Sequence, residues 1–411
     1  MSETIKDQIH YFSIDQIKQL YETNEVTPLE VTEHMFERID LLDSKFQSFA
    51  TLMKESALKT AEDISKTSAE NFGPLHGIPI AVKDLCYTEG VRTMGGTAVL
   101  ENFIPKYDAT VITKLKNAGA ILLGKLNLTE GAMGGYNPRR QVPRNPWNTE
   151  RWAGSSSSGS GVATAAGLCT GSLGSDTGGS IRQPASFCGT VGLKPTYARV
   201  SRFGLIAFAS SFDQIGPITN TVEDAAIILE VIAGQDDYDS TISTRKVEQY
   251  TKLLDDKKPK RIAYFPECFE SDGLDSEVKS AILKQIQTLK SKGHIVERVS
   301  FPYLDYLVPT YYVLTTAEAS SNLARFDGVH YGYRSKKADN PETTYLKTRT
   351  EGFGKEVQRR IMLGTFVLSA GYHDAYYTKA QKMRRLIQDK TKEILNEFDF
   401  ILTPTTPHTA F

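Results

Sequence analysis

The stretch that decides the fold is GSSSSGSGVATAAGLCTGSLGSDTGGSIRQPASFCGTVGLKP, residues 154–195. Glycine and serine dominate it, but apolar residues such as Val162, Leu173 and Ile181 recur between them. Flexible Gly/Ser linkers lack apolar residues at such intervals. The pattern therefore predicts backbone that passes through a core as a loop, a helix, a strand and a second loop.

Two glycines, Gly178 and Gly179, stand directly before Ser180 near the end of this stretch. Because glycine has no Cβ, consecutive backbone N–H groups can turn inward here without steric clash. Such a nest of N–H groups suits the negative charge that develops on an oxyanion. Ser180 is therefore the candidate nucleophile.

The composition is that of an ordinary globular protein, with 411 residues, 40% hydrophobic and 24% charged, and a net charge of −1. This balance gives no electrostatic footprint for nucleic acid, so contact with RNA would require a local patch or a partner protein. No apolar run reaches membrane-spanning length and no hydrophobic signal segment opens the chain, which favours the cytoplasm. The four scattered cysteines indicate reduced thiols rather than disulfides or a metal site.

Helix and strand patterns alternate along the chain. Strands are expected at residues 78–82 and 120–123, with a helix at 108–117 between them, and a further helix–strand unit covers 276–299. Residues 311–364 are less regular and suggest a lid or pocket wall. With no internal repeat and no linker, we expect a single α/β domain over residues 1–411.

The first of these strands ends on Lys83 and Asp84. A lysine there can extend to the surface, and an exposed lysine has a pKa of about 10.4. Burial can lower this pKa by roughly 3 to 5 units, which would make Lys83 a candidate base. A Ser-His-Asp triad stays open, because triads are spatial and the sequence lacks the Gly-x-Ser-x-Gly and His-Glu-x-x-His motifs.

Residues 119–125 imitate a phosphate-binding loop, with the pattern Gly-x-x-x-x-Gly-Lys. Leu126 stands where a serine or threonine would hold Mg²⁺, and the apolar residues lie inside the loop rather than before it. We therefore do not expect this chain to bind ATP.

Three motifs resemble those of the amidase signature family: GSSSSG at 154–159, GSDTGGSIRQP at 174–184 and GIPIAVKD at 77–84. The resemblance implies an α/β fold in which helices flank both faces of a large mixed sheet. It also implies a Ser-cisSer-Lys amidohydrolase that forms an acyl-enzyme. In that scheme Ser180 is the nucleophile, Ser156 the bridging serine and Lys83 the base. The implied oxyanion hole consists of the N–H groups of Thr177, Gly178, Gly179 and Ser180.

The C-terminal third, residues 311–361, is similar to one branch of that family, the A subunits of the bacterial aspartyl/glutamyl-tRNA amidotransferases. The resemblance implies hydrolysis of glutamine to supply ammonia for converting Glu-tRNA(Gln) or Asp-tRNA(Asn). Tyr311 would line the pocket and Arg360 would pair with the α-carboxylate of glutamine, since a guanidinium suits a carboxylate. The implied partners are a tRNA-binding B subunit, which also holds ATP and Mg²⁺, and a small C subunit. This chain would bind no cofactor.

Two features favour other interpretations. Residues 134–153 look more like free-standing amidases, which hydrolyse other carboxamides. The family also continues for several tens of residues beyond the position of Phe411, so we expect the C-terminal end to be incomplete. A free-standing amidase and an inactive scaffold paralogue are therefore the alternatives.

Overall fold

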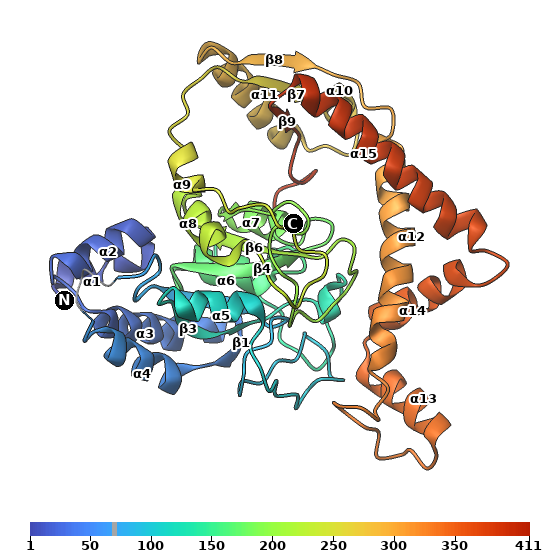
Figure 1. The fold of residues 1–411 in the computed structure, drawn as a ribbon, viewed down its shortest axis with the longest axis horizontal. Coiled ribbons are helices and arrows are strands. Elements are labelled where there is room, and N and C mark those ends of the chain that lie inside the picture. Colours follow the sequence, from blue (N-terminus) through green and yellow to red (C-terminus); the bar gives the residue numbers. More distant parts are fainter. Residues whose placement is uncertain (68–71) are drawn as a thin grey trace. The chain divides into compact units, whose positions relative to one another are not determined.

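A computed structural model describes residues 1–67 and 72–411 (Figure 1). The chain divides into two compact units. The first unit comprises Met1–Leu254 and Asn322–Arg359, and the second comprises Asp255–Ser321 and Arg360–Phe411. A single domain over residues 1–411 stays a prediction.

The first unit contains a six-stranded sheet with the order β1-β3-β2-β4-β6-β5. Its strands are β1 (Phe49–Leu52), β2 (Pro79–Lys83), β3 (Ile121–Leu126), β4 (Gly171–Asp176), β5 (Val191–Gly192) and β6 (Gln214–Thr219). β2 runs parallel to both β3 and β4, whereas the β1–β3, β4–β6 and β5–β6 pairs are antiparallel. The predicted α/β fold class with a mixed sheet is confirmed.

Several helices of the first unit pack on this sheet: α6 contacts β2, β4 and β6, while α4 contacts β3 and α8 contacts β6. Thr27 opens one helix with a capping box that is followed by proline. The helices are α1 (Glu3–Lys6), η1 (Ile9–Tyr11), α2 (Ile14–Glu22), α3 (Pro28–Phe46), α4 (Lys54–Ile64), α5 (Thr110–Asn117), η3 (Glu130–Ala132), α6 (Ser158–Ala165), α7 (Arg182–Cys188), α8 (Val222–Ile232), α9 (Tyr250–Leu253), η4 (Leu323–Arg325) and α13 (Pro341–Gly352).

The second unit is built on a three-stranded parallel sheet with the order β8-β7-β9. Successive strand residues face opposite sides, so Ile262 packs with Ile286 of α11, while Ala263 packs with Ile394 of α15. The elements are β7 (Arg261–Tyr264), α10 (Pro266–Glu270), α11 (Ser276–Ser291), β8 (Ile295–Arg298), α12 (Leu304–Asn322), α14 (Lys355–Leu368), η5 (Asp374–Thr378), α15 (Lys379–Glu397) and β9 (Phe400–Leu402), with α14 beginning in the first unit.

Two expectations about local structure were wrong. Residues 311–364, expected to be less regular than the rest of the chain, are mostly helical, in α12, α13 and α14. α12 lacks a separate polar face, because the buried Thr315 and Thr316 lie beside the buried Leu314 and Ala317, so no clean helical period is visible. The second loop expected in residues 154–195 contains the short helix α7.

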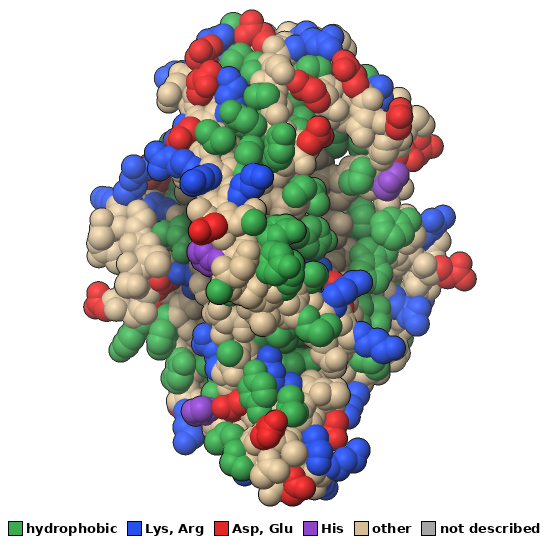
Figure 2. Space-filling model, turned by 90° about the vertical axis from the view of Figure 1, so that its right-hand side faces the viewer, with side chains coloured by type: hydrophobic (Ala, Val, Ile, Leu, Met, Phe, Trp, Pro, Cys, Tyr) green, Lys and Arg blue, Asp and Glu red, His purple; other side chains and the backbone are tan. Residues whose placement is uncertain are grey.

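The surface is of mixed charge. Figure 2 shows Lys and Arg side chains interspersed with Asp and Glu on the face it presents, in keeping with the net charge of −1. Within residues 1–67 and 72–411, no helix is long and apolar enough to cross a membrane.

Candidate active site

Lys83 lies at the end of β2, a strand whose five residues are all buried. Its ammonium nitrogen Nζ lies 2.6 Å from Ser156 Oγ, 2.9 Å from Ser157 Oγ and 2.9 Å from Ser175 Oγ. It also lies 3.3 Å from the carbonyl oxygen of Ser175. All four of these partners are uncharged, so the nearest groups around this amine are hydroxyls and one carbonyl.

Complete burial lowers the pKa of Lys83 to about 7, and the attraction of Asp176 only partly opposes this effect. With a pKa of about 7, the side chain of Lys83 is a neutral amine in a large fraction of the molecules at neutral pH. A neutral amine can accept a proton from a hydroxyl within hydrogen-bonding distance. Lys83 can therefore act as a base toward Ser156.

Ser156 belongs to the loop that precedes α6, and it is fully buried. The peptide bond between Ser155 and Ser156 is cis. The next residue, Ser157, donates its backbone N–H to the carbonyl oxygen of Ser180 over 3.1 Å, which joins this loop to the segment of the candidate nucleophile. Ser180 itself is half-buried.

Gly154 explains why this loop can lie so close to α7. Its φ of +87° is in the left-handed region, which favours glycine. A Cβ at this position would meet the Cα of Pro184 at 2.7 Å. A glycine is therefore needed where the serine loop begins.

Asp176, the last residue of β4, shapes the loop that carries Ser180. Its carboxylate accepts the N–H of Gly179 over 2.7 Å and that of Ile181 over 3.1 Å. Arg182 donates to the same carboxylate through Nε and Nη2, both over 3.0 Å. Burial alone would raise the pKa of Asp176, but the hydrogen bonds and charge of Arg182 outweigh it and the pKa is lowered. Asp176 therefore stays a carboxylate.

This arrangement narrows the predicted oxyanion hole. The N–H of Gly179 points to Asp176 and is not available to a substrate oxygen. Asp176 accepts the backbone N–H groups of Gly179, Ile181 and Arg182. The other predicted donors, the N–H groups of Thr177, Gly178 and Ser180, are not among them. These three N–H groups stay the candidate donors of the oxyanion hole.

The structure brings together Lys83 and Ser156, two of the predicted catalytic residues, by a direct hydrogen bond. The catalytic roles of Lys83, Ser156 and Ser180 stay predictions. Sequence reasoning missed Ser175 as a partner of Lys83. Val82 pairs with Leu173 in the register of β2 with β4, so Ser175, two residues further along β4, comes near Lys83 only through the pairing of the two strands, which no sequence motif indicates.

The hydroxyl of Ser157 satisfies backbone groups, since it donates to the carbonyl of Ser175 over 3.1 Å and accepts the N–H of Ser175 over 3.2 Å. In addition, it contacts Lys83 Nζ. Ser157 therefore fixes the position of the amine as well as the loop.

The predicted substrate residues, Tyr311 and Arg360, belong to the second unit, on α12 and α14. Arg360 is 8% exposed, and its guanidinium lies over the ring of Tyr312, 5.3 Å from the centroid. Such a cation–π contact fixes the plane of the guanidinium. The role of Tyr311 and Arg360 in binding glutamine stays a prediction.

A second fully buried lysine, Lys125, lies in β3 next to β2. Its Nζ donates to the carbonyl of Cys86 and, over 2.8 Å, to Thr93 Oγ1, and it lies 3.8 Å from Asp84 Oδ1. Burial lowers the pKa of Lys125 and raises that of Asp84 to about 6, while each charge opposes the shift of the other. The segment that imitates a phosphate loop is thus mostly a buried strand, whose lysine pairs with a carboxylate.

No group of three or more His, Cys, Asp or Glu side chains that could hold a metal ion occurs in the described part of the chain. Its cysteines are free thiols, and burial raises the pKa of Cys86 to about 11.

The chain matches a known family over most of its length. The model of the Amidase family matches residues 30–411, and the chain belongs to that family. The predicted family is therefore confirmed.

Two curated relatives share the name of one particular enzyme subunit. The glutamyl-tRNA(Gln) amidotransferase A subunit of Carboxydothermus hydrogenoformans is 50% identical over 409 residues, which cover 98% of this chain and 84% of the relative. The protein of the same name from Listeria innocua is 50% identical over 403 residues, 97% of this chain and 83% of the relative.

Two solved structures are also similar to this chain over most of its length. The crystal structure of the glutamyl-tRNA(Gln) amidotransferase A subunit from Thermotoga maritima matches with a TM-score of 0.78 and 41% identity, covering 98% of this chain and 80% of that one. A structure described as an amidase matches with a TM-score of 0.80 at 30% identity, covering 97% and 83% of the two chains.

Proposed function

We propose that this chain is the glutamine-hydrolysing subunit of a tRNA-dependent amidotransferase, which releases ammonia to convert Glu-tRNA(Gln) or Asp-tRNA(Asn) to Gln-tRNA(Gln) or Asn-tRNA(Asn). The observation that carries the amide chemistry is the 2.6 Å hydrogen bond between Lys83 Nζ and Ser156 Oγ in a fully buried site. The identity of 50% to proteins named as glutamyl-tRNA(Gln) amidotransferase A subunits supports the choice of glutamine.

The reaction begins with proton transfer. The neutral amine of Lys83 accepts the proton of Ser156 Oγ while Ser156 accepts that of Ser180 Oγ. Ser180 Oγ then attacks the side-chain carboxamide of glutamine. The tetrahedral oxyanion accepts hydrogen bonds from the N–H groups of Thr177, Gly178 and Ser180, and each such donor contributes roughly 2.7 to 4 kcal/mol.

The intermediate collapses when the same relay runs backwards. The Lys83 ammonium returns a proton through Ser156 to the leaving nitrogen, the C–N bond breaks, and ammonia departs from a glutamyl ester on Ser180. Water then attacks this ester and passes one proton into the relay. Glutamate leaves as Ser180 regains its proton, so the amine ends the cycle neutral.

Outside the relay, Arg360 binds the α-carboxylate of glutamine and Tyr311 lines the pocket. ATP, Mg²⁺ and the misacylated tRNA are held by the tRNA-binding B subunit, and the assembly is completed by a small C subunit. For glutamine hydrolysis this chain needs no cofactor of its own and meets the misacylated tRNA only indirectly, through the B subunit, and it works in the cytoplasm. The relatives are named as A subunits of a glutamyl-tRNA(Gln) amidotransferase, which supports the choice of partners.

The test is ammonia release from glutamine and from simple aliphatic and aryl amides, with and without the partner subunits and charged tRNA. We expect glutamine to be hydrolysed, with the rate raised by the partners and the charged tRNA. Ser180→Ala, checked for folding by circular dichroism, is expected to be inactive on every amide.

The competing candidate is a free-standing amidase, which the 30% identity to a solved amidase supports more weakly. Rapid turnover of simple amides without partners, together with no hydrolysis of glutamine under any condition, would favour that candidate and contradict the proposal.

A further inference from the structure

The first unit contains a cavity of about 620 Å³. This volume is within the range of roughly 300–1,000 Å³ that is usual for small-molecule sites. Its walls come from the segment after β5, from α8 and from the segment before α9, and neither Lys83, Ser156 nor Ser180 lines it. The cavity is therefore separate from the groups of the proposed proton relay.

Positive charge gathers in this cavity. Four cationic side chains line it, those of Lys194, Arg199, Arg245 and Lys246, against one acidic side chain, that of Glu248. The whole chain has a net charge of −1, so this excess is local. A chain of balanced charge attracts polyanions only through a local positive patch of this kind.

Arg199 holds the walls of the cavity together. It donates through Nε to Tyr250 Oη over 2.6 Å, through Nη1 to the carbonyl of Arg245 over 2.9 Å and through Nη2 to the carbonyl of Lys246 over 2.7 Å. The backbone that carries two of the cations is thereby fixed. Among the described contacts, the exposed side chains of Arg245 and Lys246 themselves make no hydrogen bond or ion pair.

Lys194 adds a cation that is partly removed from water. It is half-buried, and its Nζ donates to the carbonyl of Pro195 over 2.7 Å. An ammonium has three protons to donate, so this bond leaves donors for a ligand. Burial lowers the pKa of Lys194, although nearby Asp176 partly opposes this. An anion in the cavity would offset that cost of burial.

We infer that this cavity binds a compact ligand with two or more phosphate groups. The cationic side chains line one cavity from separate segments. A single carboxylate offers them two oxygens and one negative charge, whereas two linked phosphates offer at least four oxygens and at least two negative charges. The hydroxyls of Thr196 and Ser243 also line the cavity and can donate to phosphate oxygens. The phosphates belong either to a free diphosphate, such as a nucleotide, or to neighbouring units of an RNA backbone.

The first experiment is calorimetric titration of the full chain with inorganic pyrophosphate at low and at physiological salt. We expect saturable binding with one ligand per chain. Arg245→Gln combined with Lys246→Gln should weaken it at least tenfold. Absence of saturable binding to the wild type would overturn the inference.

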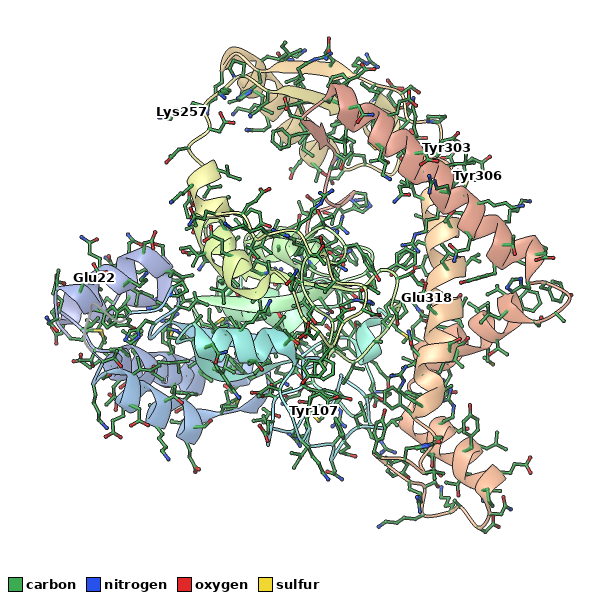
Figure 3. The ribbon with its side chains drawn as sticks, viewed as in Figure 1. Glu22, Tyr107, Lys257, Tyr303, Tyr306 and Glu318 are labelled. Carbon is green, nitrogen blue, oxygen red and sulfur yellow. The ribbon has the colours of Figure 1, made fainter. Side chains whose placement is uncertain are left out.

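The matched control removes the same charge elsewhere. Lys257 and Lys258 are exposed and lie on the segment between α9 and β7, where Figure 3 labels Lys257. Lys257→Gln combined with Lys258→Gln should change the affinity less than twofold. If both double variants weaken binding equally, the attraction is that of the general surface and the inference is wrong.

A second readout needs no substitution. Saturating pyrophosphate should slow acetylation of Lys194 and Lys246 by acetic anhydride at least threefold, as followed by mass spectrometry, while acetylation of Lys257 is unchanged. Equal rates with and without pyrophosphate would contradict binding in the cavity.

Competition then separates the two sources of phosphate. Displacement of pyrophosphate by ADP but not by a short oligoribonucleotide identifies a nucleotide site, and the reverse identifies an RNA backbone. Binding of an acidic peptide in place of pyrophosphate would overturn the inference in favour of a protein contact. All of these outcomes are independent of glutamine hydrolysis, so the proposed function is tested separately.

Discussion

Two buried lysines on neighbouring strands are placed in opposite chemical surroundings. Lys83 ends β2 among serine hydroxyls, whereas Lys125, in β3, lies 3.8 Å from the carboxylate of Asp84. Both side chains are 0% exposed, so burial alone does not distinguish them. A carboxylate partner helps one amine to keep its proton, and hydroxyl partners allow the other to lose it.

The geometry of the strands explains the separation. β2 and β3 are parallel, and Val82 pairs with Lys125 in their register. Because successive residues of a strand face opposite sides of the sheet, the ion pair of Lys125 with Asp84 belongs to the side away from Lys83. On that side Asp84 also accepts the N–H of Met94 over 2.9 Å, which anchors the chain that follows Lys83. The end of β2 thus places an amine among serine hydroxyls on one face and an anchoring carboxylate on the other.

The largest expected effect is on activity. Lys83→Met should lower kcat/KM for glutamine hydrolysis by about 10²- to 10⁴-fold, because no group then accepts the proton of Ser156. Ammonia release in a coupled assay measures this loss. Hydrolysis within tenfold of the wild-type rate would show that Lys83 is not the base.

The same substitution on the neighbouring strand should act on stability instead. Lys125→Met leaves the carboxylate of Asp84 buried without its cation and should lower the free energy of unfolding by about 3–5 kcal/mol. Lys83→Met should lower it by less, since removing an amine whose burial is costly offsets the hydrogen bonds lost by the serine hydroxyls, and no carboxylate is left unpaired. Urea denaturation of the two variants measures the difference in their free energies of unfolding. Equal destabilisation would show that the two lysines do not differ in their contribution to stability.

A double variant sharpens this comparison. Asp84→Asn combined with Lys125→Met removes both charges and should recover part of the stability that Lys125→Met alone loses. If the double variant is less stable than the wild type by the sum of the losses of the two single variants, the two residues are not coupled.

The pH dependence should follow the amine of Lys83. Since the neutral form is the base and its pKa is about 7, kcat/KM should rise with pH up to about 7 and level off above it. The pKa in the folded chain lies below the ordinary lysine value of 10.5, so the unfolded chain binds more protons between about pH 7 and 10.5. Lys83 should therefore make stability increase with pH in that window, and Lys83→Met should lack this contribution.

The smallest effect is expected at Ser157. Ser157→Ala removes one of the hydroxyls near Lys83 Nζ but leaves Ser156 and Ser175 in place. We expect a loss of about 0.5–1.5 kcal/mol in stability, as for one hydrogen bond, and a rate within about tenfold of the wild type. A loss as large as that of Lys83→Met would indicate that Ser157, rather than Ser156, passes the proton.

The sequence predicted the centre of the first unit well, because its motifs are local. The apolar run before Lys83 and the glycines around the serine loop indicated a buried strand and a close-packed loop, and both are present. The bond between Asp176 and Gly179 was not predictable, since no sequence pattern says which backbone donors a carboxylate takes. Likewise Lys125 and Asp84 meet only through the register of two strands.

The helices at residues 304–368 were harder to predict. α12 contains Pro309 and mixes threonines with apolar residues on its buried positions, so its stability comes from packing rather than from an amphipathic pattern. The same mixture of polar and aromatic residues suggested a lid or pocket wall. That prediction describes what the segment does and does not say whether the segment is helical. The substrate-binding roles of Tyr311 and Arg360 were predicted from the family resemblance alone, because no local pattern of the sequence indicated them.

The most direct test of the proton relay is to titrate the side-chain nitrogen of Lys83 by ¹⁵N NMR, with Lys83→Met used to assign its signal. We expect a signal that changes from ammonium to amine near pH 7 and is absent from the variant. A Lys83 nitrogen that stays protonated above pH 9 would contradict the relay, because no neutral amine would then be present to draw the proton from Ser156.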